Sequence, residues 1–142
     1  MTEESEVLAT FEGYADAYCA KDTEALMALF DSGDDISVIG TGADELCAGR
    51  SQIEGLFERN FAEATADRFE WHWRHVTLRG NTATVAASLT IHLHADGEAL
   101  AVPIRWTVSL HRHGGRWLWL HRHASAAAAD QDDGAAYPGQ NA

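Results

Sequence analysis

The most informative segment of the sequence covers residues 105–125 and reads Arg-Trp-Thr-Val-Ser-Leu-His-Arg-His-Gly-Gly-Arg-Trp-Leu-Trp-Leu-His-Arg-His-Ala-Ser. Polar and apolar side chains alternate on both sides of Gly114 and Gly115, with the period of two that a half-buried β-strand shows. Two glycines between such runs are typical of a tight turn. The segment therefore predicts a long antiparallel hairpin.

Two registers are open for this hairpin. A three-residue loop over 113–115 turns Leu118 and Leu120 toward the apolar face of the preceding strand. A two-residue turn at the glycines turns a mixed set toward that face instead: Trp117, Trp119, His121 and His123. We prefer the three-residue loop, because it keeps apolar residues together.

The same period continues toward the N-terminus of the hairpin. Four strands are expected in succession: 69–79, 83–95, 100–112 and 116–124. A two-residue turn at Asp96 and Gly97 pairs Leu93 with Leu100 and places the apolar side chains of both strands on one inner face. Threonine, serine and histidine fall on the outer face of this antiparallel meander.

Helical periods precede the strands. Apolar residues at steps of three and four predict a helix over 3–20, and Asp22 can cap a short second helix. A strand is expected over 36–41. Ser51 and Glu54 form a capping-box pattern at the start of a third helix that should end near residue 63. The fold class is therefore α+β: a cone, with a curved antiparallel sheet wrapped around three N-terminal helices.

Composition limits the chain to one domain and excludes several partners. With 142 residues, 46% of them hydrophobic, residues 1–125 can bury one core, and the acidic, alanine-rich stretch 126–142 is expected to be a flexible tail. A formal net charge of −12 repels nucleic acid. No run approaches the roughly 18 apolar residues that span a bilayer, and no leader is visible, so we expect a cytoplasmic protein without a membrane partner. No cofactor motif is present, and none is expected.

The hairpin over 105–125 resembles the closing hairpin of SnoaL-like domains, which belong to the nuclear transport factor 2-like superfamily with a cystatin-like fold. It looks equally like the association domain of calcium/calmodulin-dependent protein kinase. The stretch 14–30 is similar to the first two helices of this superfamily and reads Tyr-Ala-Asp-Ala-Tyr-Cys-Ala-Lys-Asp-Thr-Glu-Ala-Leu-Met-Ala-Leu-Phe. The resemblance implies a pocket between sheet and helices, commonly a homodimer through the outer sheet face, and uses that range from catalysis to assembly.

The functional residues of better-known members do not carry over to this chain. Ketosteroid isomerases of this fold hold a pocket tyrosine where Tyr14 matches, but their catalytic aspartate would fall near Ile39 or Gly40. The acidic residue of SnoaL-type cyclases would fall at Val108. The pocket arginines of the kinase association domain would fall near Val108 and Ala124. The resemblance therefore assigns no reaction.

Polar residues that point inward are the candidates for chemistry. A turn at Gly80 and Asn81 aligns Glu70, His72 and Arg74 with the inner apolar face. We expect His72 and Glu70 to form a catalytic acid/base pair, because a carboxylate orients an imidazole that titrates near neutral pH. Five residues are expected to bind the substrate: Tyr14, Tyr18, Arg74, Trp106 and Arg122. The alternative is that Glu70 and Arg74 pair at the rim and His72 is a hydrogen-bonded core histidine.

The outer face carries histidine pairs two residues apart, which point the same way along a strand. Three pairs stand out: His92/His94, His111/His113 and His121/His123. No carboxylate or cysteine lies at a complementary spacing, so a metal site is not expected. Four tryptophans expected beside them give this face the composition of a dimer interface: Trp71, Trp73, Trp117 and Trp119. We expect a homodimer through this face.

These patterns predict a SnoaL-like pocket protein that takes a small organic ligand as its partner. As an enzyme it would isomerise, cyclise or hydrate that molecule by acid/base catalysis. The rival hypothesis is a non-catalytic ligand-binding or dimerisation module. The sequence alone does not decide between the two.

Overall fold

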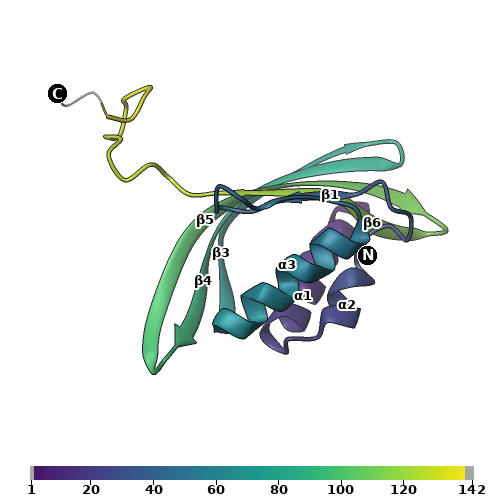
Figure 1. Cartoon of the computed structure of the whole chain (residues 1–142). Coiled ribbons are helices and arrows are strands. Elements are labelled where there is room, and N and C mark those ends of the chain that lie inside the picture. Colours follow the sequence, from purple (N-terminus) through teal and green to yellow (C-terminus); the bar gives the residue numbers. More distant parts are fainter. Residues whose placement is uncertain (1, 140–142) are drawn as a thin grey trace.

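The computed structural model describes residues 2–139, and Figure 1 shows a curved sheet arched over a group of helices. The N-terminal half contains α1 (Glu3–Cys19), α2 (Thr23–Met27), β1 (Ser37–Ile39), β2 (Leu46–Ala48) and α3 (Arg50–Glu63). The C-terminal half contains β3 (Thr65–Arg79), β4 (Thr82–Ala95), β5 (Glu98–His113) and β6 (Arg116–Ser125). The expected α+β cone is confirmed.

The helices begin where polar side chains or backbone geometry satisfy their first N–H groups. Asp22 caps α2 as expected, since its side chain accepts the Ala25 N–H at 3.0 Å. The capping box expected at Ser51 was wrong: the N-cap of α3 is Gly49, which makes no side-chain cap. Asp34 supplies the acceptor instead, at 2.8 Å from the Arg50 nitrogen, and Gly49 has a φ of 89° that favours glycine.

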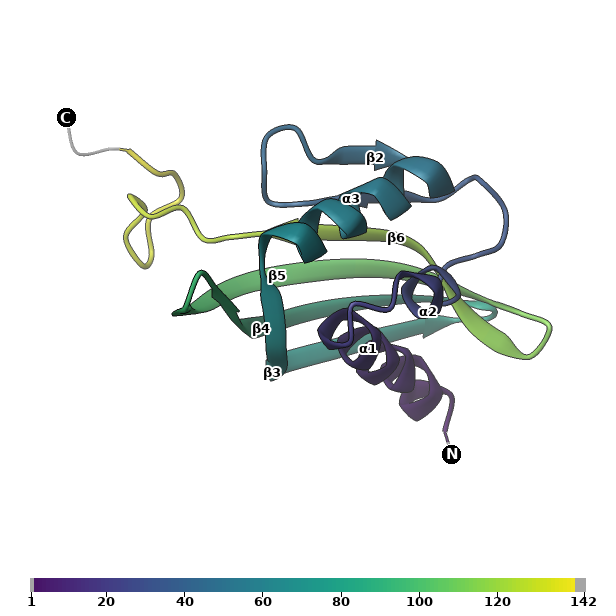
Figure 2. The ribbon, with the colours of Figure 1, turned by 60° about the horizontal axis from the view of Figure 1, so that its bottom comes forward.

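The sheet has six strands in the order β2-β1-β6-β5-β4-β3 (Figure 2). The strands from β3 to β6 form the expected antiparallel meander. Strand β1 extends the sheet by pairing in parallel with β6, which makes the sheet mixed. The short β2, which no sequence pattern predicted, pairs with β1 at the edge.

The hairpin at Asp96 and Gly97 has the expected register. Leu93 pairs with Leu100 and Leu89 with Ile104, so the apolar residues of β4 and β5 share the concave face. Phe11 and Tyr14 of α1 and Phe57 of α3 are buried in the core on that face. The helices thus cover the concave side, and no helix in the described part of the chain covers the convex side (Figure 1).

The preferred register of the last hairpin was wrong. His113 pairs with Arg116, so Gly114 and Gly115 form a two-residue turn, and Trp117 and Trp119 are buried. Burying two indoles removes more apolar surface from water than burying two leucines does. The alternation would then turn His121 inward, but a bulge at Leu120 reverses it.

This bulge determines which end of β6 faces the core. Leu110 pairs with Trp119 and Ser109 pairs with His121, so Leu120 is the extra residue. Beyond it, Arg122 and Ala124 lie on the concave face opposite Val108 and Trp106. Arg122 therefore points inward as expected, although by a different register.

A second bulge divides β3. Trp71 pairs with Leu89 and Trp73 pairs with Ser88, so His72 is the extra residue. On the turn side of the bulge, Arg74 faces inward as expected. On its other side the faces are exchanged: Trp71 packs against the core, while Glu70 and His72 lie on the convex face.

The far end of the β4–β5 hairpin forms an arm that extends past the core. Residues 98–103 of β5 are exposed and pair only with β4, because the pairing of β5 with β6 begins at Arg105. Pro103, which has no N–H to donate, lies next to this boundary.

Residues 126–139 contain no helix or strand and extend from the sheet (Figure 1). The last three residues of the expected tail lie outside the described part. Within residues 2–139, no helix is long and apolar enough to cross a membrane.

The observed registers of β6 and β3 predict unequal costs for truncating large apolar side chains in these strands. Trp119→Ala should lower the free energy of unfolding by about 3–5 kcal/mol, because it empties a fully buried site. Leu120→Ala should cost less, and Trp73→Ala, at a side chain that is 57% exposed, should change stability by less than about 0.5 kcal/mol. Urea denaturation measures all three. A larger loss for Leu120→Ala than for Trp119→Ala would support the three-residue loop instead.

Candidate ligand-binding site

A pocket of about 450 Å³ opens between the helices and the concave face of the sheet. One wall is apolar and comes from the β4–β5 hairpin, including its arm: Ile91, Leu93, Leu100, Val102 and Ile104. The opposite side is formed by Tyr14 and Tyr18 of α1, by Asn60 near the end of α3 and by the loop after β1. The volume and lining are those of a site for a small organic molecule.

Arg122 is the cationic group of this pocket. Its side chain extends from β6, and the residue is only 6% exposed. Nη1 donates to the Tyr14 hydroxyl at 2.8 Å, and Nη2 donates to the carbonyl of Ile39 at 3.4 Å. The buried Nε–H has no acceptor within the described part of the chain. A guanidinium is always charged, so its burial without a full set of acceptors is costly.

Tyr14 and Tyr18 lie one helical turn apart on α1 and stack with their ring centroids 5.8 Å apart. Burial raises the pKa of Tyr14, although the neighbouring Arg122 opposes this shift. Burial, and after it electrostatic repulsion from the Tyr14 phenol group, raise the pKa of Tyr18 as well. Both phenols are therefore protonated at neutral pH and can donate a hydrogen bond.

Trp106 lines the pocket beside the guanidinium. The residue is 2% exposed, and the Arg122 Cζ lies 5.6 Å from the centroid of its ring. Its Nε1–H is buried and finds no acceptor among residues 2–139. Two residues of the pocket lining, Trp106 and Arg122, therefore each have a buried donor without an acceptor.

The loop after β1 brings a carboxylate to the pocket. The Glu45 Oε1 atom accepts the Gly42 N–H at 2.6 Å, while Oε2 lies 3.8 Å from Arg59. A Cβ at Gly40 would lie 2.8 Å from the Glu45 Oε1 atom, and one at Gly42 would lie 2.7 Å from it. Glycine at both positions therefore leaves room for the side chain of Glu45.

The expected catalytic pair does not reach the pocket. On the convex face, the Glu70 carboxylate accepts a hydrogen bond from His92 Nε2 at 2.8 Å, and His72 Nε2 is hydrogen-bonded to the Thr90 hydroxyl. The pairing with His92 lowers the pKa of Glu70. Arg74 lies on the concave face but pairs with Glu12 of α1 at 3.0 Å and is not part of the pocket lining.

The four other predicted residues do come together: Tyr14, Tyr18, Trp106 and Arg122. Sequence reasoning missed Glu45 and Asn60. For Glu45 a signal was available in the Gly-Thr-Gly run at 40–42, which we interpreted only as a turn. For Asn60 no pattern marks the residue, because its position depends on how α3 packs.

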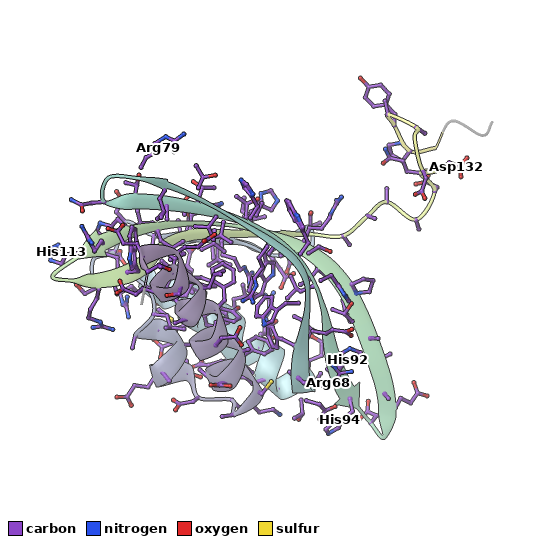
Figure 3. The ribbon with its side chains drawn as sticks, turned by 180° about the vertical axis from the view of Figure 1, so that it is seen from behind. Arg68, Arg79, His92, His94, His113 and Asp132 are labelled. Carbon is purple, nitrogen blue, oxygen red and sulfur yellow. The ribbon has the colours of Figure 1, made fainter. Side chains whose placement is uncertain are left out.

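The convex face is more polar than expected. Of the four tryptophans predicted there, Trp117 and Trp119 are buried and Trp71 packs against the core, so only Trp73 remains. Histidines pair with carboxylates along the strands: His94 with Asp67 at 3.0 Å, and His92 with Glu70. Figure 3 shows His92 and His94 near Arg68 at one end of the sheet. In the described range 2–139, no three His, Cys, Asp or Glu side chains are grouped to hold a metal ion.

A family model described as a SnoaL-like domain matches residues 7–129. The chain belongs to the SnoaL-like domain family. A search of curated proteins finds no match to this SnoaL-like chain.

Solved structures with the same fold include a protein from Xanthomonas campestris that is provisionally described as a calcium/calmodulin-dependent protein kinase II association domain. It is 26% identical, with a TM-score of 0.80 and 91% of each chain covered. A provisionally described dehydratase of the NTF2-like family from Streptomyces avermitilis is 20% identical, with a TM-score of 0.76 and coverage of 88% of this chain and 96% of that one. A ketosteroid isomerase-like protein from Erwinia carotovora atroseptica is 18% identical, with a TM-score of 0.74 and coverage of 90% and 99%. The last two similarities show the fold alone.

The close approach of Gly42 and Glu45 predicts an energetic coupling between them. Gly42→Ala should destabilise the protein, and the cost should fall in a Glu45→Ala background by about 0.5–3 kcal/mol, because all three close contacts of the new Cβ are with the Glu45 side chain beyond its own Cβ. Gly40→Ala is the control, since its Cβ would also meet the Cβ of Glu45 at 2.9 Å, which Glu45→Ala retains. A double-mutant cycle by denaturation measures this coupling. Additive costs for Gly42 and Glu45 would contradict it.

Proposed function

We propose that this SnoaL-like chain binds a small organic molecule in the pocket beneath the sheet. The observation that carries the proposal is the pocket itself: about 450 Å³, one apolar wall and one wall with few, buried polar groups. Acid/base chemistry of the isomerase, cyclase or hydratase type would fall to Glu45 and Tyr14. Glu70 and His72 lie on the opposite face of the sheet and would not reach the bound molecule.

The binding proposal is tested with the neutral fluorescent probe N-phenyl-1-naphthylamine. Its fluorescence should rise saturably with the wild-type protein, because the apolar wall excludes water. Val102→Trp should abolish the rise, since Val102 lines the pocket at its open side. Ala101→Trp, on the same strand but facing outward, should leave the rise unchanged. Equal titrations for the wild type and Val102→Trp would contradict binding in this pocket.

We also propose that two copies associate through the convex face, which supports the alternative role as a dimerisation module. No helix of the described residues 2–139 covers this face, and Trp73 is 57% exposed on it next to Ser88 of β4. Thr107 of β5 is exposed on the same face. The similar Xanthomonas campestris protein is described as an association domain.

We also propose a cytoplasmic location. The two cysteines, Cys19 and Cys47, form no disulfide, which supports a place in the reducing cytoplasm.

Charge on the convex face should dissociate such a dimer. Thr107→Glu and Trp73→Glu should each lower the mass measured by light scattering to that of one chain, because a buried unpaired carboxylate is costly. Leu46→Glu, which adds the same charge at an exposed leucine on the edge strand β2, is the matched control. A wild-type protein that is already monomeric at high concentration would refute the dimer.

A further inference from the structure

The polar end of the pocket contains hydrogen-bond donors that lack acceptors. Arg122 Nε–H and Trp106 Nε1–H are both buried and orphaned within the described residues. The Tyr14 oxygen accepts from Arg122 Nη1, so the proton of Tyr14 remains available to donate. Since buried polar groups in native structures are nearly always hydrogen-bonded, this cluster is incomplete without an acceptor.

The charge at this end is also unbalanced. Arg122 is only 6% exposed, and none of the ion pairs among residues 2–139 involves it. Its partners are a neutral phenol and a backbone carbonyl. The concave-face Arg74 differs, because it forms an ion pair with Glu12 at 3.0 Å. The fold therefore neutralises one arginine of this face and leaves the one in the pocket unpaired.

Shape and chemistry together define what would complete the site. A carboxylate provides two acceptor oxygens for a guanidinium and its neighbouring donors, and charge-assisted hydrogen bonds are the strong ones. The rest of the lining on β4 and β5 is aliphatic, from Ile91 to Ile104. A molecule with a carboxylate at one end and an apolar body would meet both parts of the pocket.

Glu45 is the group that opposes an anion here. It lines the same pocket, with a side chain 18% exposed. Its oxygens are already engaged, one with the Gly42 N–H and one near Arg59. These partners reduce its effect on a bound anion without removing it, so its charge should weaken the binding of an acid and leave that of a neutral molecule unaffected.

We propose that the pocket binds organic monocarboxylates with an apolar body, with the carboxylate held by Arg122, Tyr14 and Trp106. This inference rests on the proposed ligand-binding function and specifies its ligand class. Arg122 is the residue that selects an acid over its neutral analogue. The apolar wall contributes binding affinity equally to the acid and to its neutral analogue.

The test compares 4-phenylbutyrate with 4-phenylbutyramide, which share shape and differ in charge, by isothermal titration calorimetry. The wild type should bind the acid about tenfold or more tightly than the amide. Arg122→Met should remove this preference, and Glu45→Gln should increase affinity for the acid alone. Arg74→Met, the matched control, removes the same charge from the concave face and should leave the preference intact.

The outcomes separate the ligand class from binding itself. Equal affinities for acid and amide in the wild type would overturn the carboxylate proposal, whereas the pocket proposal is decided by the neutral probe and Val102→Trp. An equal loss of acid preference in Arg74→Met and Arg122→Met would also overturn it, because general charge would then explain the selectivity. If Arg122→Met fails to fold, Tyr14→Phe and Glu45→Gln test the proposal instead. Tyr14→Phe should weaken acid binding more than amide binding, and Glu45→Gln should strengthen acid binding. Unchanged acid binding in both would refute the proposal.

Discussion

The stacking of Trp119 on Tyr14 holds the C-terminal strand against the N-terminal helix and sets the register of the closing hairpin. The two rings are nearly parallel, with an interplanar angle of 10° and centroids 5.0 Å apart, and the indole N–H donates to Thr10 at 2.8 Å. This contact joins the last strand to the first helix, more than a hundred residues apart in sequence. It requires the two-residue turn at the glycines, which turns Trp119 inward. The bulge at Leu120 then follows, because without it the histidines beyond would enter the core.

The same bulge creates the site. By shifting the alternation of β6 by one residue, it places Arg122 among aromatic rings, where a charged side chain is costly to bury. The helix contributes the tyrosine that the guanidinium contacts, and the neighbouring strand contributes Trp106. The register that buries Trp119 in the core therefore also places the Arg122 guanidinium, with its unpaired Nε–H, at the pocket.

Much of the fold followed from the sequence, because it rests on local periodicity. The turn at Asp96 and Gly97 fixed the pairing of β4 with β5, and Asp22 marked the start of α2. The bulges were missed because no glycine marks them. The signal was a change of parity: Phe69 and Trp71 are odd-numbered whereas Val76 and Leu78 are even-numbered, and one uninterrupted strand cannot bury both sets. Tyr14 and Tyr18 were predicted in the pocket from helical spacing, and Trp106 from the alternation of β5. Arg122 was predicted there from a register that the bulge at Leu120 replaces. Glu45 was not predicted: the glycines at 40 and 42 hinted at a close neighbour, but which side chain fills that space depends on tertiary contacts around β1.

The exposed arm of the β4–β5 hairpin affects how a molecule enters. Its residues 98–103 are exposed and pair with β4 alone, yet Leu100 and Val102 form part of the pocket wall. Segments with few buried contacts open at a small fraction of the global unfolding free energy. Bending of this arm would thus widen the entrance while Trp119 and the core stay packed. Exchange of the proposed ligand would therefore be decoupled from stability: the association rate would depend on the stiffness of the hairpin, and the lifetime of the fold on the aromatic core.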